Sequence, residues 1–500
     1  MNVTSSDWAA LAPALVVLAS ALLVVGLDIA LRPGTRRSLL VLLSLVGIAI
    51  PAGLLTQRLV SAAPAIRAFG GALVLDDLAA FLSVAILAAT GLLLVGAEVD
   101  TRRRRIAFGE YYALVLTSAA SMMLLVASND FLMMFLNLEI LSLALYVLTG
   151  ITRRNPRSNE ASVKYLVTGA FATGFLLMGV AFVYGAAGAI DLAGIGLAIA
   201  QHGSTPLLDL GLGLVLVGFG FKIGAVPFHM WVPDVYEGAP TTTTAFMSVT
   251  VKAAGVGALI RMLLIAFPAR AELWGDLLWW MAVATMILGN LIALQQRSVK
   301  RMLAYSSVAH TGYALVAVAT MANADGTVNP AGAAGALMYL MVYTFMTFGA
   351  FMMLVYMGHE VEVPGHDSEW QDAENIDDLA GMGATHPWAA LASLRGKPFP
   401  TYDIPPPAGF FGKFTLFAAA VSQGDVTIAV IGVMASLVSL YYYLRVVVTM
   451  YMQDPVTSDE KVDKTIGLSI ALATIGTLAL GVQPALFWEW AARSIGLLAG

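Results

Sequence analysis

Four ionisable residues and one histidine lie inside otherwise apolar segments, where they are well placed to do chemistry. Glu139 lies in MMFLNLEILSLALYV, Lys222 in GFGFKIGAV and Lys252 in AFMSVTVKAAGVGAL. Lys413 follows a proline cluster in IPPPAGFFGKF, and His310 lies in YSSVAHTGYAL. A charged side chain at the centre of a membrane helix costs about 2.5–3.5 kcal/mol on insertion scales, so these residues are candidates for a proton or ion site.

The helix that carries Lys222 is predicted to break at Pro227, because proline removes a helix hydrogen bond. Irregular backbone at membrane depth survives only where protein or a water-filled cavity satisfies the freed carbonyls. Lys413 stands beside a second predicted break, at the proline cluster. Two interrupted segments at corresponding places predict an internally repeated transporter.

The two breaks suggest how the chain is organised. Repeats of five helices each are predicted, and two odd-numbered repeats in one membrane must be inverted relative to each other. The predicted units are an N-terminal three-helix segment at 1–107, a first repeat at 108–266, a second repeat at 273–451, and a C-terminal loop with the last helix at 452–500.

Each buried charge needs a partner in the membrane. An isolated Glu139 would stay protonated and bonded to a neighbouring helix, whereas a lysine from another helix would hold it ionised. We therefore predict that Glu139 and Lys222 approach within ion-pair or single-water distance. Lys252 is too far from either helix end to reach the interface, unlike Arg261, which is expected to snorkel. His310 suits a proton relay and equally suits a hydrogen bond to a neighbouring Ser or Thr.

Composition sets the class of protein. Hydrophobic residues make up 59% of the chain and charged residues only 12%, whereas soluble domains carry about 25% charged residues. The formal net charge of −5 argues against nucleic acid as a partner. The chain has no cysteine, which excludes thiolate zinc sites and ordinary iron–sulfur clusters. Any redox chemistry would belong to partner subunits.

Apolar runs of about 20 residues predict an all-α polytopic membrane protein with about fourteen transmembrane helices, from 8–30 to 466–491. The first span is expected to be retained, since no basic region or cleavage site precedes it. Basic residues crowd every second short loop, which predicts that both termini face away from the cytoplasm. The acidic segment between Glu360 and Asp378 falls on the cytoplasmic side, as a solvated connector or a docking surface.

Four stretches of the chain resemble the subunit N family of bacterial proton-pumping NADH:quinone oxidoreductase, respiratory complex I. They are KIGAVPFHMWVPDVYEGAPTTTTAFMSVTVKAA, NDFLMMFLNLEILSLALYVLTG before it, and QQRSVKRMLAYSSVAHTGY and AGFFGKF after it. The resemblance runs from about residue 70 to the C-terminus. The PDVYEGAP segment separates subunit N from subunits L and M and from cation/proton antiporter subunits.

This resemblance implies an antiporter-like subunit of the bacterial inner membrane, with discontinuous helices seven and twelve. The glutamate of the family's fifth helix and the lysines of its seventh, eighth and twelfth helices correspond to Glu139, Lys222, Lys252 and Lys413. The chain itself would carry no cofactor and no metal. NADH, FMN, iron–sulfur clusters and quinone would be bound by partner subunits, and the other membrane-arm subunits and the lipid bilayer would be its partners.

The expected function is proton translocation driven by quinone reduction elsewhere in the complex. Movement of Glu139 toward or away from Lys222 would load or release a proton, Lys252 would pass it on, and Lys413 would exchange it with the other side. Lysines that act only electrostatically, while water carries the proton, fit the same residues. Two other functions also fit, a secondary cation/proton antiporter and a structural scaffold of the membrane arm.

One segment departs from the family pattern. Residues Ser393 to Asp403 read SLRGKPFPTYD, where an unbroken apolar run is expected. Arg395 and Lys397 would each cost about 2.5–3.5 kcal/mol at membrane depth. The change suggests two compensating frameshifts in the recorded gene sequence, or else a genuine polar opening of helix twelve. A genuine opening would argue against an exit path through Lys413. We expect helix twelve to span the membrane and Lys413 to face the central axis.

Overall fold

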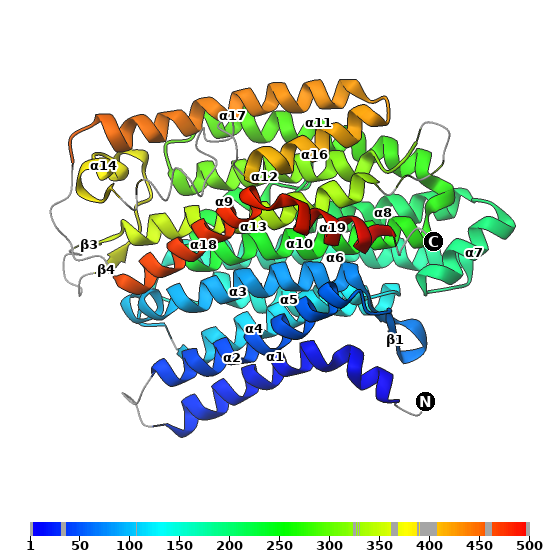
Figure 1. Ribbon diagram of the computed structural model, residues 1–500, viewed down its shortest axis with the longest axis horizontal. Helices are drawn as coiled ribbons and strands as arrows, with labels where there is room; N and C mark the ends of the chain where they lie inside the picture. Colours follow the sequence, from blue (N-terminus) through cyan, green and yellow to red (C-terminus); the bar gives the residue numbers. More distant parts are fainter. Residues whose placement is uncertain are drawn as a thin grey trace.

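The structure, a computed structural model, consists almost entirely of helices that run side by side (Figure 1). It describes residues 4–31, 37–106, 108–323, 331–361, 369–387, 408–455 and 463–496, and single residues 327, 329 and 390. Within these residues, 13 helices are long and apolar enough to cross a membrane. The predicted all-α polytopic fold is confirmed. The segment Ser393 to Asp403 and the expected break before Lys413 lie outside the described residues.

The elements follow one another along the chain with short connections. In order they are α1 (Ser5–Ala30), α2 (Arg37–Ser61), β1 (Ile66–Ala68), η1 (Phe69–Gly71), β2 (Leu73–Leu75), α3 (Asp77–Arg103), α4 (Phe108–Ala127), α5 (Phe131–Thr149), α6 (Pro156–Ala187), α7 (Leu192–His202), α8 (Pro206–Ile223), α9 (Trp231–Gly238), α10 (Thr241–Ala266), η2 (Pro268–Arg270), α11 (Ala271–Leu294), α12 (Val299–Ala319), α13 (Ala331–Tyr356), β3 (His359–Val361), β4 (Glu369–Gln371), η3 (Ile376–Leu379), α14 (Met382–Thr385), α16 (Ala408–Ser422), α17 (Val426–Met452), α18 (Lys464–Val482) and α19 (Pro484–Gly496). β1 pairs with β2 and β3 with β4, each as an antiparallel hairpin.

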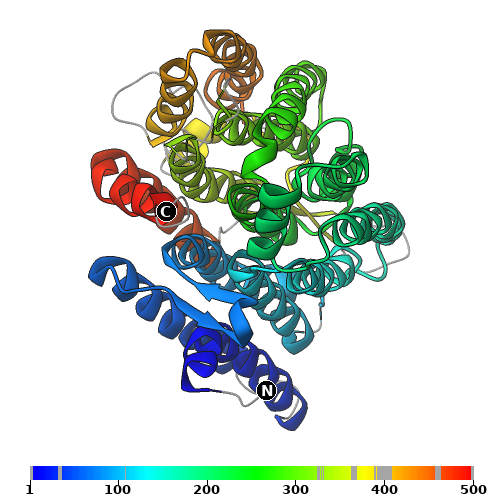
Figure 2. The ribbon, with the colours of Figure 1, turned by 90° about the vertical axis from the view of Figure 1, so that its right-hand side faces the viewer.

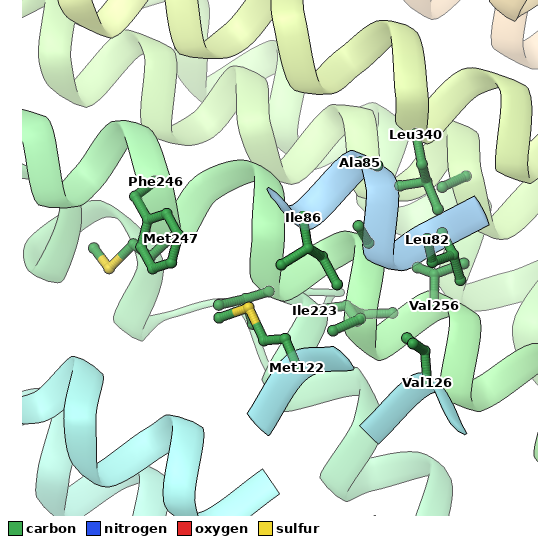
Figure 3. Close-up of a cluster of buried hydrophobic side chains, with 14 of the residues drawn as sticks. Leu82, Ala85, Ile86, Met122, Val126, Ile223, Phe246, Met247, Val256 and Leu340 are labelled. Carbon is green, nitrogen blue, oxygen red and sulfur yellow. The ribbon is translucent and has the colours of Figure 1, made fainter. Parts of the chain in front are cut away.

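Helices α3, α10, α12 and α13 form the core and are buried on almost all sides. A helix that is hydrophobic all round is suited to such a position. Small residues let the helices approach closely: a Cβ at Gly257 of α10 would meet the side chain of Leu82 on α3. Figure 3 shows this contact region, where side chains of α3, α4, α8, α10 and α13 interlock. Polar groups on α10 and α12 are therefore shielded from lipid.

The outer helices present apolar side chains to their surroundings. Leu22 and Ile29 of α1 and Phe171 of α6 are 77%, 81% and 71% exposed. Exposure of this kind fits a surface in contact with lipid or with neighbouring membrane subunits. Both termini lie at one end of the bundle, with α7 and the β1–β2 hairpin, whereas β3, β4 and α14 lie at the other end (Figures 1 and 2).

The predicted topology can be tested with introduced cysteines, since the chain has none. Asn155 caps α6, and the nearby Arg157 pairs with Glu374 at 3.2 Å, beside the start of α12. The 21 residues of α12 span about 32 Å at 1.5 Å each. Cysteines at Asn155 and Asn323 should therefore react with an impermeant thiol reagent from opposite faces, Asn155 from the cytoplasm. Labelling of both from one face would refute the assignment.

The expectation that Arg261 snorkels to the interface is wrong. Its side chain is 1% exposed, and its guanidinium pairs with Asp76 at 2.7 Å. Arg261 Nε also donates to the carbonyl of Val126 at 3.0 Å. The carboxylate of Asp76, which caps α3, compensates the charge inside the protein, so the side chain has no need to reach water.

The acidic segment is only partly a solvated connector. Asp377 is exposed, but Asp372 is 4% exposed and pairs with Arg104 at 2.5 Å. Asp372 also accepts a hydrogen bond from the Thr241 hydroxyl at the start of α10. Burial lowers the pKa of Arg104, but the carboxylates of Asp100 and Asp372 outweigh this effect and raise it above the ordinary value. Asp372 thus connects the end of α3 to the start of α10.

Candidate functional site

The helix that carries Lys222 ends one residue after it. α8 stops at Ile223, and the chain turns at Gly224 with φ of +74° before α9 begins at Trp231. The break therefore falls at Gly224 rather than at the predicted Pro227. Glycine is required there, because a Cβ would lie 2.8 Å from Cγ2 of Val232 and because L side chains avoid this φ.

Side chains satisfy the backbone groups that this break sets free. The Phe221 carbonyl accepts a hydrogen bond from Trp231 Nε1 at 2.9 Å. The Ile223 carbonyl accepts one from Thr311 Oγ1 of α12 at 2.8 Å. The interrupted backbone is thus buried in protein, as the sequence predicts for irregular structure at membrane depth.

Lys222 is held by a hydroxyl rather than by a carboxylate. Its side chain is 6% exposed, and Nζ donates to Ser142 Oγ of α5. Nζ also lies 5.8 Å from the ring centroid of Tyr165 on α6. A tyrosine face attracts a cation, so both neighbours favour the ammonium form in a site without bulk water.

Glu139 lies on the same helix as Ser142 and is partly buried. Its Oε1 accepts a hydrogen bond from Thr173 Oγ1 of α6 at 2.7 Å. Among the described residues Glu139 and Lys222 form no direct ion pair, so this form of the prediction is wrong. The reason is that Ser142 takes the ammonium and Thr173 takes the carboxylate. Glu139 and Ser142 lie one turn apart on α5, and an approach of Glu139 to Lys222 through one water stays a prediction.

Lys252 lies in a cluster of polar groups in the core. It is 4% exposed, and Nζ donates to both the Oγ, at 2.5 Å, and the carbonyl oxygen of Ser307 on α12. The hydroxyl of Tyr343 on α13 lies 3.4 Å from Nζ and donates to Ser307 Oγ at 2.8 Å. The ring of Tyr343 lies 5.2 Å from the same Nζ. The described surroundings thus stabilise the ammonium by dipoles rather than by an opposite charge.

His310 lies one turn after Ser307 on α12 and is 7% exposed. Its Nδ1 forms a 2.5 Å hydrogen bond with the Tyr339 hydroxyl of α13. Its ring lies 4.9 Å from the ring of Tyr343 and 5.9 Å from that of Tyr313. One partner of the His310 ring is therefore a tyrosine hydroxyl. This position places His310 between the groups that contact Lys252 and those that contact Lys413.

Lys413 is 8% exposed and lies on α16. Its Nζ donates to Ser436 Oγ of α17 at 2.9 Å and lies 4.5 Å from the ring centroid of Tyr313. Ser436 in turn donates to the Tyr313 hydroxyl at 3.3 Å. Tyr313 is on α12, so Lys413 faces the same central helix as Lys252, as predicted.

The structure thus brings the candidates into one buried series. Lys252, His310 and Lys413 are joined through side chains of α12 and α13, and Thr311 connects the end of the Lys222 helix to α12. The hydroxyl groups beside the lysines and His310 were not predicted from the sequence; they are those of Ser142, Ser307, Ser436, Tyr313, Tyr339 and Tyr343. Ser and Tyr are too common in membrane helices to be singled out, although two of them share the YSSVAHTGY run with His310.

The chain is similar to known proteins over most of its length. Residues 128–439 match the family described as "NADH:quinone oxidoreductase/Mrp antiporter, TM". NADH-quinone oxidoreductase subunit N of Trichlorobacter lovleyi is 42% identical over 489 residues, which cover 96% of this chain and 95% of that protein. Subunit N 2 of Roseiflexus castenholzii is 42% identical over 427 residues, covering 83% of this chain and 82% of that protein.

Solved structures are similar to this chain over almost its whole length. A chain of respiratory complex I from Thermus thermophilus with bound Aureothin aligns with a TM-score of 0.77 and 30% identity, covering 95% of this chain and 98% of that chain. A chain of the Mrp complex from Dietzia sp. DQ12-45-1b has a TM-score of 0.85, 20% identity and coverage of 99% and 98%, which establishes a shared fold only. The chain belongs to the antiporter-like membrane subunits of the NADH:quinone oxidoreductase/Mrp family, and within them to subunit N of NADH-quinone oxidoreductase.

Proposed function

We propose that this chain moves protons across the bacterial inner membrane as part of the membrane arm of respiratory complex I. The proton-handling residues are Glu139, Lys222, Lys252, His310 and Lys413. The observation that carries the proposal is the series of three buried lysines, each held by a serine hydroxyl. Burial of so many cations in one membrane protein is costly, and intramembrane ionisable groups of this kind mark proton pathways.

Each lysine can take part because its surroundings are nearly balanced. Burial opposes the ammonium, whereas the serine hydroxyl and the tyrosine ring favour it. A small shift of Glu139 relative to Lys222 then changes the charge that Lys222 carries. Lys252 receives the proton near the centre, and His310 and Tyr313 lie between it and Lys413, where the proton leaves. Lysines that act as electrostatic relays beside a water path fit the same geometry.

The energy for this step comes from partner subunits. Among the described residues, no three His, Cys, Asp or Glu side chains gather as a metal site. The chain also lacks the cysteines that ordinary iron–sulfur clusters need. In our proposal NADH, FMN, iron–sulfur clusters and quinone are bound elsewhere in the complex. The exposed apolar faces of the outer helices meet lipid and the other membrane-arm subunits, and both termini lie on the non-cytoplasmic side.

The predicted repeats belong to the same proposal. The units 108–266 and 273–451 each contain a lysine near the end of a helix, at Lys222 and Lys413. Support comes from the break at Gly224 and from the matching environments, since each lysine donates to a serine hydroxyl and lies against a tyrosine ring. Segments 1–107 and 452–500 lie outside the repeats.

The test is proton translocation by the whole complex in membrane vesicles that carry Lys252→Met. Methionine keeps the length of the side chain and removes the charge, so NADH-driven acidification should fall by about tenfold or more, the usual size for loss of a proton-transfer group. Lys164→Met is the matched control, because Lys164 is 45% exposed and pairs with surface carboxylates. Unchanged pumping stoichiometry in Lys252→Met would instead favour a scaffold.

A secondary cation/proton antiporter is the other candidate, because the family that residues 128–439 match is described as "NADH:quinone oxidoreductase/Mrp antiporter, TM". Purification separates the two functions. Co-isolation with flavin and iron–sulfur subunits supports complex I. Sodium/proton exchange by the chain in the absence of those subunits supports the antiporter.

A further inference from the structure

The carbonyl oxygen of Ser307 is shared by more donors than it can serve at once. It accepts from Lys252 Nζ, and it lies 3.3 Å from Thr311 Oγ1. In an α-helix it also takes the backbone N–H four residues later, which is that of Thr311 itself. A carbonyl has two lone pairs. The Thr311 hydroxyl and the Lys252 ammonium therefore compete for one of them.

The Thr311 hydroxyl has an alternative acceptor. Oγ1 lies 2.8 Å from the carbonyl oxygen of Ile223, the last residue of α8 and the neighbour of Lys222. A hydroxyl has one hydrogen, so it serves Ile223 or Ser307 but not both fully. While it donates to Ile223, the Ser307 carbonyl is available to Lys252. If the end of α8 moves away, the hydroxyl turns to Ser307 and weakens the hold on Lys252.

We propose that Thr311 and Ser307 are positioning residues which couple the helix break beside Lys222 to the binding of Lys252. This inference rests on the proposed proton translocation. Both residues are 1% exposed, so no bulk water can replace their hydrogen bonds. The coupling passes from the Ile223 carbonyl through the Thr311 hydroxyl to the carbonyl and hydroxyl of Ser307. The two lysines do not have to contact each other.

The Ser307 hydroxyl fixes the other half of this contact. Its Oγ accepts from Lys252 at 2.5 Å and from the Tyr343 hydroxyl at 2.8 Å. The α12 segment that holds Lys252 is therefore contacted by α8 through Thr311 and by α13 through Tyr343.

The first experiment measures proton translocation by the whole complex in vesicles. Thr311→Val removes the hydroxyl at nearly constant shape, and we expect a loss of about threefold to tenfold, the size of one buried hydrogen bond. Thr311→Ser keeps the hydroxyl and should restore most of the rate. Thr250→Val is the matched control, because the Thr250 hydroxyl is equally buried and, among the described residues, bonds only to the Phe246 carbonyl of its own helix. An equal loss in Thr250→Val would overturn the proposal.

The second experiment separates coupling from a merely structural role. A double-mutant cycle with Lys222→Met and Lys252→Met measures how strongly the two lysines depend on each other. In the Thr311→Val background this dependence should shrink until the two losses simply multiply. If the dependence between the two lysines is unchanged in this background, Thr311 does not couple them. If neither lysine variant affects translocation, the proposed function itself fails, which is a different outcome.

Discussion

Glu139→Gln and Lys222→Met are each expected to lower proton translocation by about tenfold or more, and the double variant should lose little beyond either single one. The reason is that the two groups act as a unit in the proposed function: Lys222 is held by Ser142, which lies one turn from Glu139 on α5. Residues that act together show strongly non-additive losses. The measurement is a double-mutant cycle on NADH-driven acidification of vesicles.

A variant of Ser142 gives a further test of this pair. Ser142→Ala removes the hydroxyl that now holds Lys222, so Lys222 should turn toward Glu139 and the coupling between the two should grow. Losses that simply multiply in the Glu139→Gln and Lys222→Met cycle would show that the pair does not act as a unit. The proton would then reach Lys222 by a route that does not depend on the carboxylate.

Asp76→Asn is expected to cost about 3–5 kcal/mol of folding free energy, because it leaves the Arg261 guanidinium buried without a counter-charge. The two groups lie 2.7 Å apart, and their side chains are only 1% and 5% exposed. Asparagine caps a helix as well as aspartate does, so the cap of α3 should survive. The loss would appear as a lower melting temperature of the purified complex and less of this chain in the membrane.

Asp209→Asn is the matched control for that experiment. Asp209 pairs with Arg270 at the same distance of 2.7 Å, but both side chains are about 30% exposed. Such pairs contribute about 0–1 kcal/mol, since water screens them. A loss in Asp76→Asn no larger than in Asp209→Asn would contradict the view that burial makes the Asp76 pair important.

The hydroxyl groups beside the lysines change how the lysine series is understood. Ser142, Ser307 and Ser436 each accept a hydrogen bond from one of the lysines. Serine and tyrosine hydroxyls can both donate and accept, so they can link a lysine to the next group without a permanent charge.

Several features of this protein were determined by local sequence. The membrane class and the spans follow from the length and hydrophobicity of each segment, since the bilayer demands about 20 apolar residues whatever lies beside them. The identity of Lys222, Lys252 and Lys413 as candidates follows in the same way, because a charge within an apolar run is costly wherever it lies. His310 was found because a histidine can change its charge near neutral pH.

Only the tertiary structure decided which groups meet. Arg261 pairs with Asp76 across 185 positions of sequence, and Lys252 meets Ser307 across 55. No local pattern encodes such contacts, since they depend on how whole helices pack. The same holds for the break, which falls at Gly224, before Pro227, where Val232 Cγ2 leaves no room for a Cβ. Hydrophobicity therefore fixed where the helices run, and packing between helices fixed the partner of each buried charge.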